Sequence, residues 1–380
     1  IFLVFIGILI SFLIFISTIG IKTDKLNSQI INQIKVFDEN LNLELKKVNI
    51  IFDPIKLRIN LKTIGTNLIY KEKEIQLASI QSTISVKSFF KNQFSLTNLK
   101  ISTKSIEIKN LLSFFRLFKN DAKIYLVEKL ILKGDILGNI YVEFDNKGRI
   151  KDNFKIDGFV KNGRINTLRK YQLDKMNFRF NIVKNNINFN EISIYLNDNN
   201  LFSPELIVQK KKNKFFIKGK AYSKKISLNE KQIKDYIYLD NSYLAIKNVD
   251  FKINNEFSFE INQKYKIRNF TNNFIIDLDN LIVNSQYDYT NFFPKSQKKI
   301  EFQKHKLFVS YKKDMLDIKG SGDVLFQENN DKIKYSIKKT NKEIDFDIKL
   351  NILKNQLNLD LLNYKKEGDT NLEINLIGTK

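Results

Sequence analysis

Apolar and polar side chains alternate along most of the chain, and this pattern limits the folds that the chain can adopt. The stretch 55–62, for example, reads Ile-Lys-Leu-Arg-Ile-Asn-Leu-Lys. A period of two residues is typical of a β-strand that has one apolar and one polar face. We therefore expect a mostly β protein in which strands joined in series form a largely antiparallel, repetitive sheet. The same alternation recurs at residues 41–45, 140–144, 178–182, 192–196, 249–253, 257–261, 344–350 and 372–376.

Only a few segments interrupt this alternation. Three of them have the composition of turns, which Asn, Asp and Gly favour: 145–148, 162–163 and 185–186. Two others follow helical spacing, at 108–118 and at 229–238, where Asn229 can cap the helix. Helices this short cannot cover a wide sheet. Its apolar face must then be buried on a second sheet, be closed inward in a barrel, or remain as a curved groove that a ligand fills.

The first 21 residues contain no charged side chain. At 1.5 Å per residue, a helix of about 20 apolar residues covers the roughly 30 Å hydrocarbon core of a membrane. A cleavable signal peptide has a shorter apolar region, of about 7 to 15 residues, followed by a small-residue cleavage site that is not evident here. We therefore interpret residues 1–21 as an uncleaved, single-pass transmembrane anchor.

The chain after the anchor divides into three predicted regions. Leu26, Ile30 and Ile34 fall at helical spacing, so we expect the anchor helix to continue as an amphipathic stalk over 22–37. Two β-repeat regions follow, at 38–225 and 226–380, with no clear break between them. Because the chain starts with Ile and ends on a strand-like segment, we expect it to be a fragment of a longer protein.

The composition excludes most catalytic chemistry. The 380 residues include no cysteine and one histidine, so disulfides, thiolate metal sites and cysteine nucleophiles are impossible. We expect the histidine, His305, to be an exposed strand residue whose pKa is lowered by the flanking Lys304 and Lys306. The stretch 158–164 has the glycine spacing of a phosphate loop but not its final residues, so we predict a turn there. At 320–322, we expect the glycines to relieve crowding between side chains in a strand. We therefore predict no enzyme activity, no metal site and no cofactor.

The chain is strongly basic. Lysine and arginine number 64 against 41 aspartates and glutamates, which gives a formal charge of +23. This charge favours anionic partners, although the frequent Ile, Lys and Asn are also what an AT-rich genome encodes. The phenylalanines fall on the apolar side of the alternation and not among the lysines. Since base stacking would need them beside the lysines, we expect no nucleic-acid partner.

The order of elements in two segments carries a family resemblance. Residues 84–118 read ISVKSFFKNQFSLTNLKISTKSIEIKNLLSFFRLF, in which a strand, a short Phe-rich segment, further strands and a short helix follow one another. Residues 154–196 continue strand after strand in a similar way. Together with the apolar N-terminus, this arrangement resembles the AsmA-like family of bacterial envelope proteins, which includes YhdP- and TamB-type bridge-like lipid transfer proteins. The resemblance covers the whole chain but is architectural, and the family has no catalytic motif to carry over.

The resemblance implies a function in outer-membrane lipid homeostasis. Members of the family are thought to be anchored in the inner membrane and to extend through the periplasm as bent β-sheets. An apolar groove in these sheets carries phospholipid toward the outer membrane. We therefore expect an inner-membrane protein with most of its chain in the periplasm, whose partners are membrane lipids and envelope proteins. The candidate groove-lining residues are Ile55, Leu57, Ile59, Phe178, Phe180, Phe251, Phe257, Phe259 and Phe346.

A second hypothesis, from a different class of protein, explains the same alternation. The chain could be a structural or assembly scaffold of the cell envelope with a closed β-sandwich or solenoid core and no ligand. Its apolar faces would then pack against one another. The two hypotheses differ in what covers the apolar faces, which is lipid in the first and protein in the second.

Overall fold

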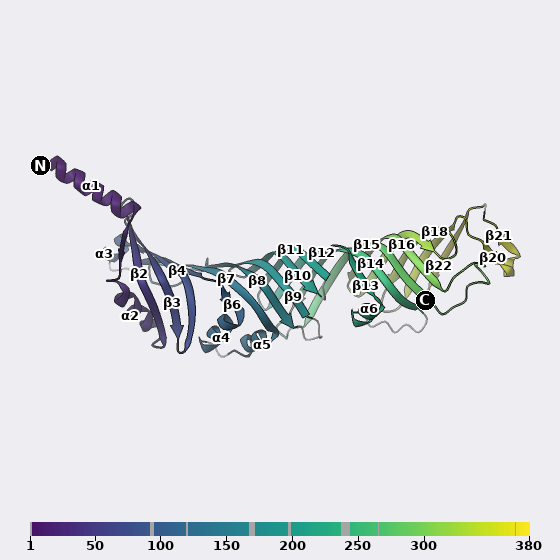
Figure 1. Ribbon diagram of the computed structural model, residues 1–380, viewed down its shortest axis with the longest axis horizontal. Helices are drawn as coiled ribbons and strands as arrows, with labels where there is room; N and C mark the ends of the chain where they lie inside the picture. Colours follow the sequence, from purple (N-terminus) through teal and green to yellow (C-terminus); the bar gives the residue numbers. More distant parts are fainter. Residues whose placement is uncertain are drawn as a thin grey trace. The chain divides into compact units, whose positions relative to one another are not determined.

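The computed structural model is mostly β, with a few short helices (Figure 1). It describes residues 2–91, 95–118, 121–166, 172–196, 199–236, 244–264, 266–368 and 370–380. Contacts divide the chain into two compact units, Ile1–Asp198 and Asn199–Lys380. The predicted division at residue 225 falls within the second of these units. The expectation of a mostly β, antiparallel fold is confirmed.

The first unit contains one antiparallel sheet whose strands follow one another along the chain. Its strands are β1 (Ile21–Thr23), β2 (Leu41–Asp53), β3 (Arg58–Tyr70), β4 (Lys73–Ser85), β5 (Leu96–Thr103), β6 (Ile106–Glu107), β7 (Ile131–Glu143), β8 (Lys155–Asn166), β9 (Gln172–Val183) and β10 (Asn186–Leu196). Each pairs with the next, except that β5 and the short β6 both pair with β7. Among the described residues, no pairing joins β1 to β10, so the strands of this unit do not close on themselves.

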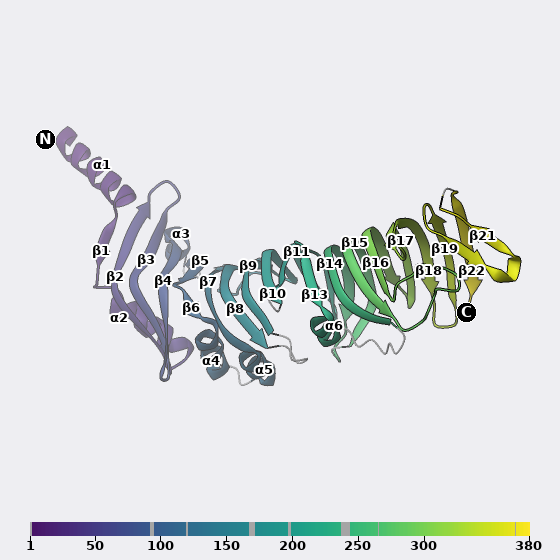
Figure 2. The same ribbon diagram turned by 45° about the vertical axis from the view of Figure 1, so that its right-hand side comes forward.

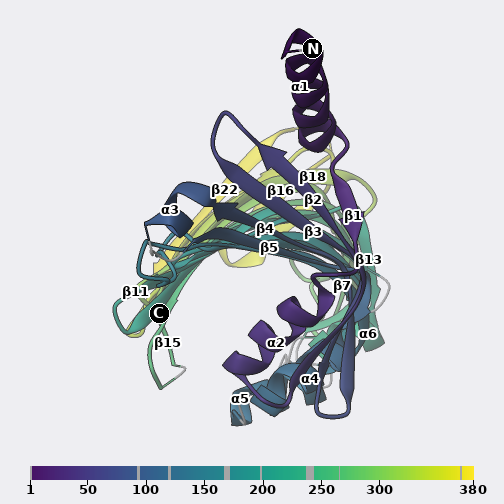
Figure 3. The same cartoon turned by 90° about the vertical axis from the view of Figure 1, so that its left-hand side faces the viewer.

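Five helices accompany this sheet in the described part of the unit. They are α1 (Phe2–Thr18), α2 (Asn27–Phe37), α3 (Val86–Phe90), α4 (Ile108–Phe118) and α5 (Ala122–Leu130). Figure 3 shows α2, α4 and α5 on the same side of the sheet. The apolar stripe of α4 places Phe114 in a buried cluster with Tyr70, Leu77 and Ile106. The helix predicted over 108–118 is thereby confirmed.

The N-terminal helix α1 differs from the expected anchor. It has 17 residues and rises about 25 Å, which is less than the roughly 30 Å of a membrane core. Among the described residues, no helix is both long enough and apolar enough to cross a membrane. The structure therefore does not support the prediction of a transmembrane span over residues 1–21.

The amphipathic helix predicted over 22–37 is present over Asn27–Phe37, but it does not continue α1. Gly20 has a φ of +71° and ends the helical path, and a Cβ at this position would lie 2.5 Å from the carbonyl oxygen of Ile50. The chain then runs as β1 along β2, with Lys22 opposite Asn49. The amphipathic helix begins only at Asn27, where its side chain donates to the carbonyl of Leu45 at 3.1 Å. Pairing with β2 therefore separates the two helices.

The second unit also contains one antiparallel sheet. Its strands are β11 (Asn199–Lys211), β12 (Lys214–Ser223), β13 (Ile226–Asn229), β14 (Leu244–Ile261), β15 (Ile267–Ser285), β16 (Lys299–Lys312), β17 (Met315–Leu325), β18 (Asn330–Lys339), β19 (Ile344–Ile352) and β22 (Leu372–Thr379). Both β12 and β13 pair with β14, and β22 pairs with β19 at the end of the series. Among the described residues, β11 and β22 do not pair, so the strands of this unit do not close on themselves either.

Two further elements complete the second unit. The helix α6 (Glu230–Tyr236) begins after Asn229. The Asn229 side chain accepts from the Gln232 backbone, and the Gln232 side chain accepts from the Asn229 backbone, each at 3.0 Å. This reciprocal cap confirms the predicted role of Asn229, while residues 237–238 of the predicted helix lie outside the described part. A separate hairpin, β20 (Leu357–Leu359) and β21 (Tyr364–Lys366), contains the short 3₁₀-helix η1 (Asp360–Leu362) at its turn.

Two local predictions are wrong, one from the alternation and one from the composition of turns. Residues 54–57 form the turn between β2 and β3 and not the start of a strand, since Pro54 has no N–H to donate and Leu57 has a φ of +48°. The stretch 158–164, with its pair Asn162-Gly163, lies inside β8 and not in a turn. Asn162 has a φ of +52° there, and the register with β9 shifts between Val160 and Gly163. The left-handed residue produces a β-bulge and not a chain reversal.

Candidate apolar binding face

Cross-strand pairing shows which side chains share a face of the first unit's sheet. Residues directly opposite each other in an antiparallel pair project to the same side. Six isoleucines lie opposite one another in a single row from β4 to β10: Ile80, Ile101, Ile140, Ile156, Ile182 and Ile187. None of the six is fully buried. We call the side that carries this row the apolar face of the first unit.

The second unit has an apolar face of the same kind. One row runs from β15 to β19 through Phe274, Val309, Ile318, Ile337 and Phe346. The parallel row comprises Ile253, Ile276, Leu307, Gly320, Tyr335, Ile348 and Leu376. Apart from Gly320, which is buried, and Leu376, which is exposed, the members of both rows are half-buried. The apolar surface therefore continues across successive strands.

The opposite side of the second unit's sheet is polar. Its row over the same strands comprises Lys252, Asp277, Lys306, Ser321, Lys334, Lys349 and Asn375. This row is shifted by one residue from the apolar row. The next row on this side also carries the exposed Ile275 and Phe308. The period of two residues therefore separates a mostly polar face from an apolar face.

Helices cover only part of each apolar face. In the first unit, α4 packs Phe114 against Ile75, Leu77 and Ile106, all of which are buried. In the second unit, α6 packs Ile233 against Ile226 and Leu228 in the same way. Ile80 and Ile101 pack against the first cluster, and the other isoleucine, valine and phenylalanine members of the rows stay half-buried outside both clusters. Neighbouring side chains in the sheet cover the sides of these residues. The ends of the side chains that point away from the sheet remain accessible to solvent.

The predicted groove-lining residues fall into two groups. Seven are half-buried on the apolar faces: Ile59, Phe178 and Phe180 in the first unit, and Phe251, Phe257, Phe259 and Phe346 in the second. The other two, Ile55 and Leu57, lie in the turn after Pro54 and are 92% and 46% exposed. The prediction that Ile55 and Leu57 lie in a strand was wrong, because the alternation of residue types begins already in the turn and continues into β3.

Glycines face aromatic rings at several places on the apolar faces. The pairs are directly opposite in register: Gly158 with Phe180, Gly219 with Phe257, Gly320 with Tyr335, and Gly378 with Phe346. A Cβ on Gly219 would lie 2.9 Å from the Phe257 ring, so the ring occupies the space above the glycine. The sequence analysis found the Gly-Ser-Gly at 320–322 but not these pairs. Their partners can be identified only from the register.

The ring over Gly158 leads to a stability prediction. Its Cβ would lie 2.6 Å from Cζ of Phe180 and would also contact the carbonyl oxygen of Leu137. Gly138 lies directly opposite Gly158, but its Cβ would be 3.4 Å from the nearest atom. We therefore expect Gly158→Ala to lower the free energy of unfolding by about 1–3 kcal/mol, because both the ring and the backbone at Leu137 must move.

The matched control is Gly138→Ala, which should change the same free energy by less than about 0.5 kcal/mol. Urea unfolding monitored by circular dichroism measures both variants. Equal effects of the two substitutions would show that the ring does not restrict residue 158.

His305 is buried, contrary to the sequence prediction. Its side chain is 2% exposed and lies on the apolar face over Gly322. Nδ1 lies 3.2 Å from the Tyr335 hydroxyl, and Nε2 lies 2.9 Å from the carbonyl oxygen of Asp323. Burial lowers the pKa of His305, opposed by the hydrogen bond to Asp323. The flanking lysines point to the opposite side of the strand, so burial and not their charge is the main cause.

The lowered pKa predicts a pH-dependent stability. Above pH about 6.5, the pKa of histidine in the unfolded chain, His305 is neutral in both states and its contribution to stability is complete. As the pH falls below that value, His305 is protonated in the unfolded chain but stays neutral in the folded protein. Its contribution to stability therefore decreases until the pH reaches the lower pKa of the folded state.

We expect the free energy of unfolding to fall between pH 7.5 and 5.5 with a slope of up to about 1.4 kcal/mol per pH unit. Urea unfolding at several pH values measures this slope. His305→Gln keeps a polar side chain but does not titrate, so its slope should be smaller. An unchanged slope in this variant would assign the pH dependence to other groups.

No protein-family model, curated protein or solved structure matches this chain. The described residues also include no group of three or more His, Asp or Glu side chains that could hold a metal ion. The candidate site is therefore defined by the two half-buried apolar faces alone.

Proposed function

We propose that the protein holds the acyl chains of phospholipids along its apolar faces, and so shields or conducts phospholipid between the membranes of a bacterial envelope. The observation that supports the proposal most directly is the row of six half-buried isoleucines across the first unit. The corresponding rows of the second unit have the same character. In this role, acyl chains lie against the apolar face and head groups stay in solvent.

The energetics favour an apolar ligand. Each CH₂ group that leaves water for an apolar surface is worth about 0.8 kcal/mol, so an acyl chain along several side chains gains many such contributions. A continuous apolar surface across many strands is also larger than what soluble proteins usually leave open to water. Such a ligand supplies the cover that the described helices do not.

The scaffold hypothesis with a closed core receives less support. A sandwich would bury the apolar rows on a second sheet, whereas Ile140 and Phe346, for example, remain half-buried. The described strands of each unit also do not close on themselves. We therefore prefer the lipid hypothesis. If an envelope protein is found to cover the apolar faces, the scaffold hypothesis would replace it.

The proposal also gives a role to α1. The helix exposes apolar side chains on every side, with exposed fractions from 46% at Phe15 to 65% at Val4 and Phe5. We propose that α1 associates with the bacterial inner membrane and that the rest of the chain lies in the periplasm. Phospholipids of that membrane are the natural source of the acyl chains.

Site-specific photo-crosslinking in cells tests the proposal on the full chain. A benzophenone amino acid replaces Phe180 or Phe257 on the apolar faces, and the matched positions Arg179 and Asn254 on the polar faces serve as controls. We expect phospholipid adducts, identified by mass spectrometry, at the first two positions and not at the controls. Adducts with a protein at Phe180 and Phe257, without lipid, would favour the scaffold hypothesis.

A further inference from the structure

The hairpin β20–β21 exposes a group of apolar side chains that the apolar faces do not include. Leu361 is 97% exposed, Leu362 is 73% exposed and Tyr364 is 42% exposed. The two leucines lie in η1 at the turn, and Asn363 reverses the chain with a φ of +49°. Figure 2 shows the hairpin projecting from the last strands of the second unit. We call Leu361, Leu362 and Tyr364 the hairpin tip.

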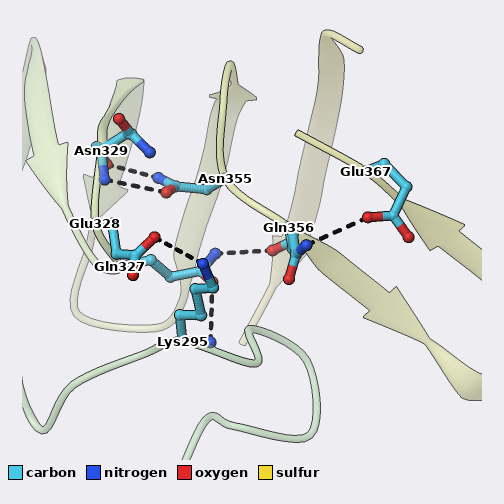
Figure 4. Close-up of polar contacts among 7 residues, drawn as sticks. All are labelled: Lys295, Gln327, Glu328, Asn329, Asn355, Gln356 and Glu367. Atoms are coloured by element: carbon cyan, nitrogen blue, oxygen red, sulfur yellow. Dashed lines mark hydrogen bonds and ion pairs between the residues drawn. The ribbon is translucent and has the colours of Figure 1, made fainter. Parts of the chain in front are cut away.

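A network of polar contacts fixes the base of this hairpin (Figure 4). Asn355, which is 3% exposed, accepts from the backbone of Asn329 at 3.1 Å and donates to its carbonyl at 2.6 Å. The Gln327 side chain donates to the carbonyl of Gln356 at 2.7 Å and accepts from the Lys295 backbone at 3.1 Å. These contacts connect the hairpin to two other loops of the unit.

A buried lysine reinforces the base. Lys366 is 1% exposed, and its ammonium group donates to the carbonyls of Leu353, Asn355 and Glu367 at 3.1, 2.7 and 3.0 Å. Leu357 on the opposite strand is equally buried. The hairpin is therefore held at its base by specific bonds, and its leucines are exposed at a fixed position.

The residue types along the hairpin match the layers of a membrane surface. The leucines are outermost, Tyr364 follows, and the exposed Lys354 and Lys365 lie behind it near the base. Leucines reach the acyl boundary of a bilayer, tyrosine favours the head-group level, and lysines contact lipid phosphates. Asp360 is exposed beside the leucines, and its carboxylate disfavours insertion of the turn below the level of the head groups.

Two observations favour a lipid surface over a protein pocket as the occupant. The graded order from leucine to lysine suits a flat, layered medium. The net charge of +23 also attracts the chain to anionic lipid head groups. We propose that the hairpin tip inserts into the surface of a bilayer that contains anionic phospholipid, and so docks the second unit on a membrane. This inference rests on the hairpin and on the charge of the chain, and it goes beyond the proposed role of the apolar faces.

Fluorescence at the tip tests the proposal on the full chain. Because the chain has no cysteine, Tyr364→Cys can be labelled with an environment-sensitive dye at this position only. Vesicles of phosphatidylglycerol and phosphatidylcholine should raise the emission several-fold and shift it to the blue, and spin-labelled lipid should quench it. The control label at Asn341→Cys, in an exposed turn of the same unit, should not respond.

A second variant distinguishes vesicle binding by the hairpin tip from vesicle binding by α1. Leu361→Ser with Leu362→Ser should abolish the response of the label at residue 364 while the lipid adducts at Phe257 persist. A protein that binds these vesicles without lipid quenching at residue 364 would overturn the inference and leave the proposed function untouched. A response that survives the double substitution would overturn it as well.

Discussion

Replacing both Phe257 and Phe259 with aspartate is expected to remove most bound phospholipid and to leave the fold of the second unit intact. Both rings are half-buried on the apolar face, and Phe257 covers Gly219. Losing the apolar surface of a ring costs about 1.5–3 kcal/mol of binding free energy, and a carboxylate facing acyl chains must also be desolvated. A loss of about 3 kcal/mol corresponds to more than a hundredfold in affinity.

The measurement is phospholipid per chain after a high-salt wash, determined by mass spectrometry, together with circular dichroism of the same sample. Asn254→Asp with Asn273→Asp is the matched control, because it adds the same charge to the polar face of β14 and β15. This control should retain its phospholipid. Global unfolding of the Phe257 and Phe259 variant would instead identify these rings as a closed core, which is what the scaffold hypothesis requires.

Replacing Lys366 with methionine is expected to destabilise the β20–β21 hairpin strongly. Methionine fills a similar volume, but it leaves the carbonyls of Leu353, Asn355 and Glu367 without their common donor. A buried carbonyl left without a partner costs about 1–3 kcal/mol. The bond to Asn355 is buried, whereas the bonds to Leu353 and Glu367 are partly buried and are worth less. We therefore expect a loss of about 3–5 kcal/mol in the local free energy of opening.

Hydrogen exchange of the backbone amides over residues 353–367 measures this local stability. Lys365→Met is the matched control, since its neighbouring ammonium group is exposed and forms one ion pair, with Glu367 at 3.5 Å. Exposed pairs of this kind contribute about 0–1 kcal/mol. Similar exchange rates in the two variants would show that the three carbonyls find other donors when Lys366 is absent.

The alternation predicted the strands well because it reports a local property. A period of two describes the direction of successive side chains, whatever the strand pairs with. Phe178, Phe180, Phe257 and Phe259 therefore lie on the apolar faces, and the helical spacing over 108–118 was equally reliable. Local capping chemistry likewise identified Asn229 as the start of α6.

The features that the sequence analysis missed depend on register. His305 was predicted to be exposed because its neighbours in sequence are lysines, but its environment comes from Gly322, Tyr335 and Asp323 on other strands. The glycine and aromatic pairs depend on register in the same way. The hairpin tip carried a local signal, since the alternation breaks at Leu361-Leu362, but its exposure depends on a base formed by distant loops.

The serial order of strands within each unit also affects how the protein forms. Most strands pair with the next strand in sequence, so a new hairpin closes a short loop and has a small entropy cost. Folding of a unit can therefore start at any hairpin and spread to its neighbours. The same arrangement allows duplication of one hairpin to lengthen an apolar face while the existing pairings are kept, as in other repetitive architectures.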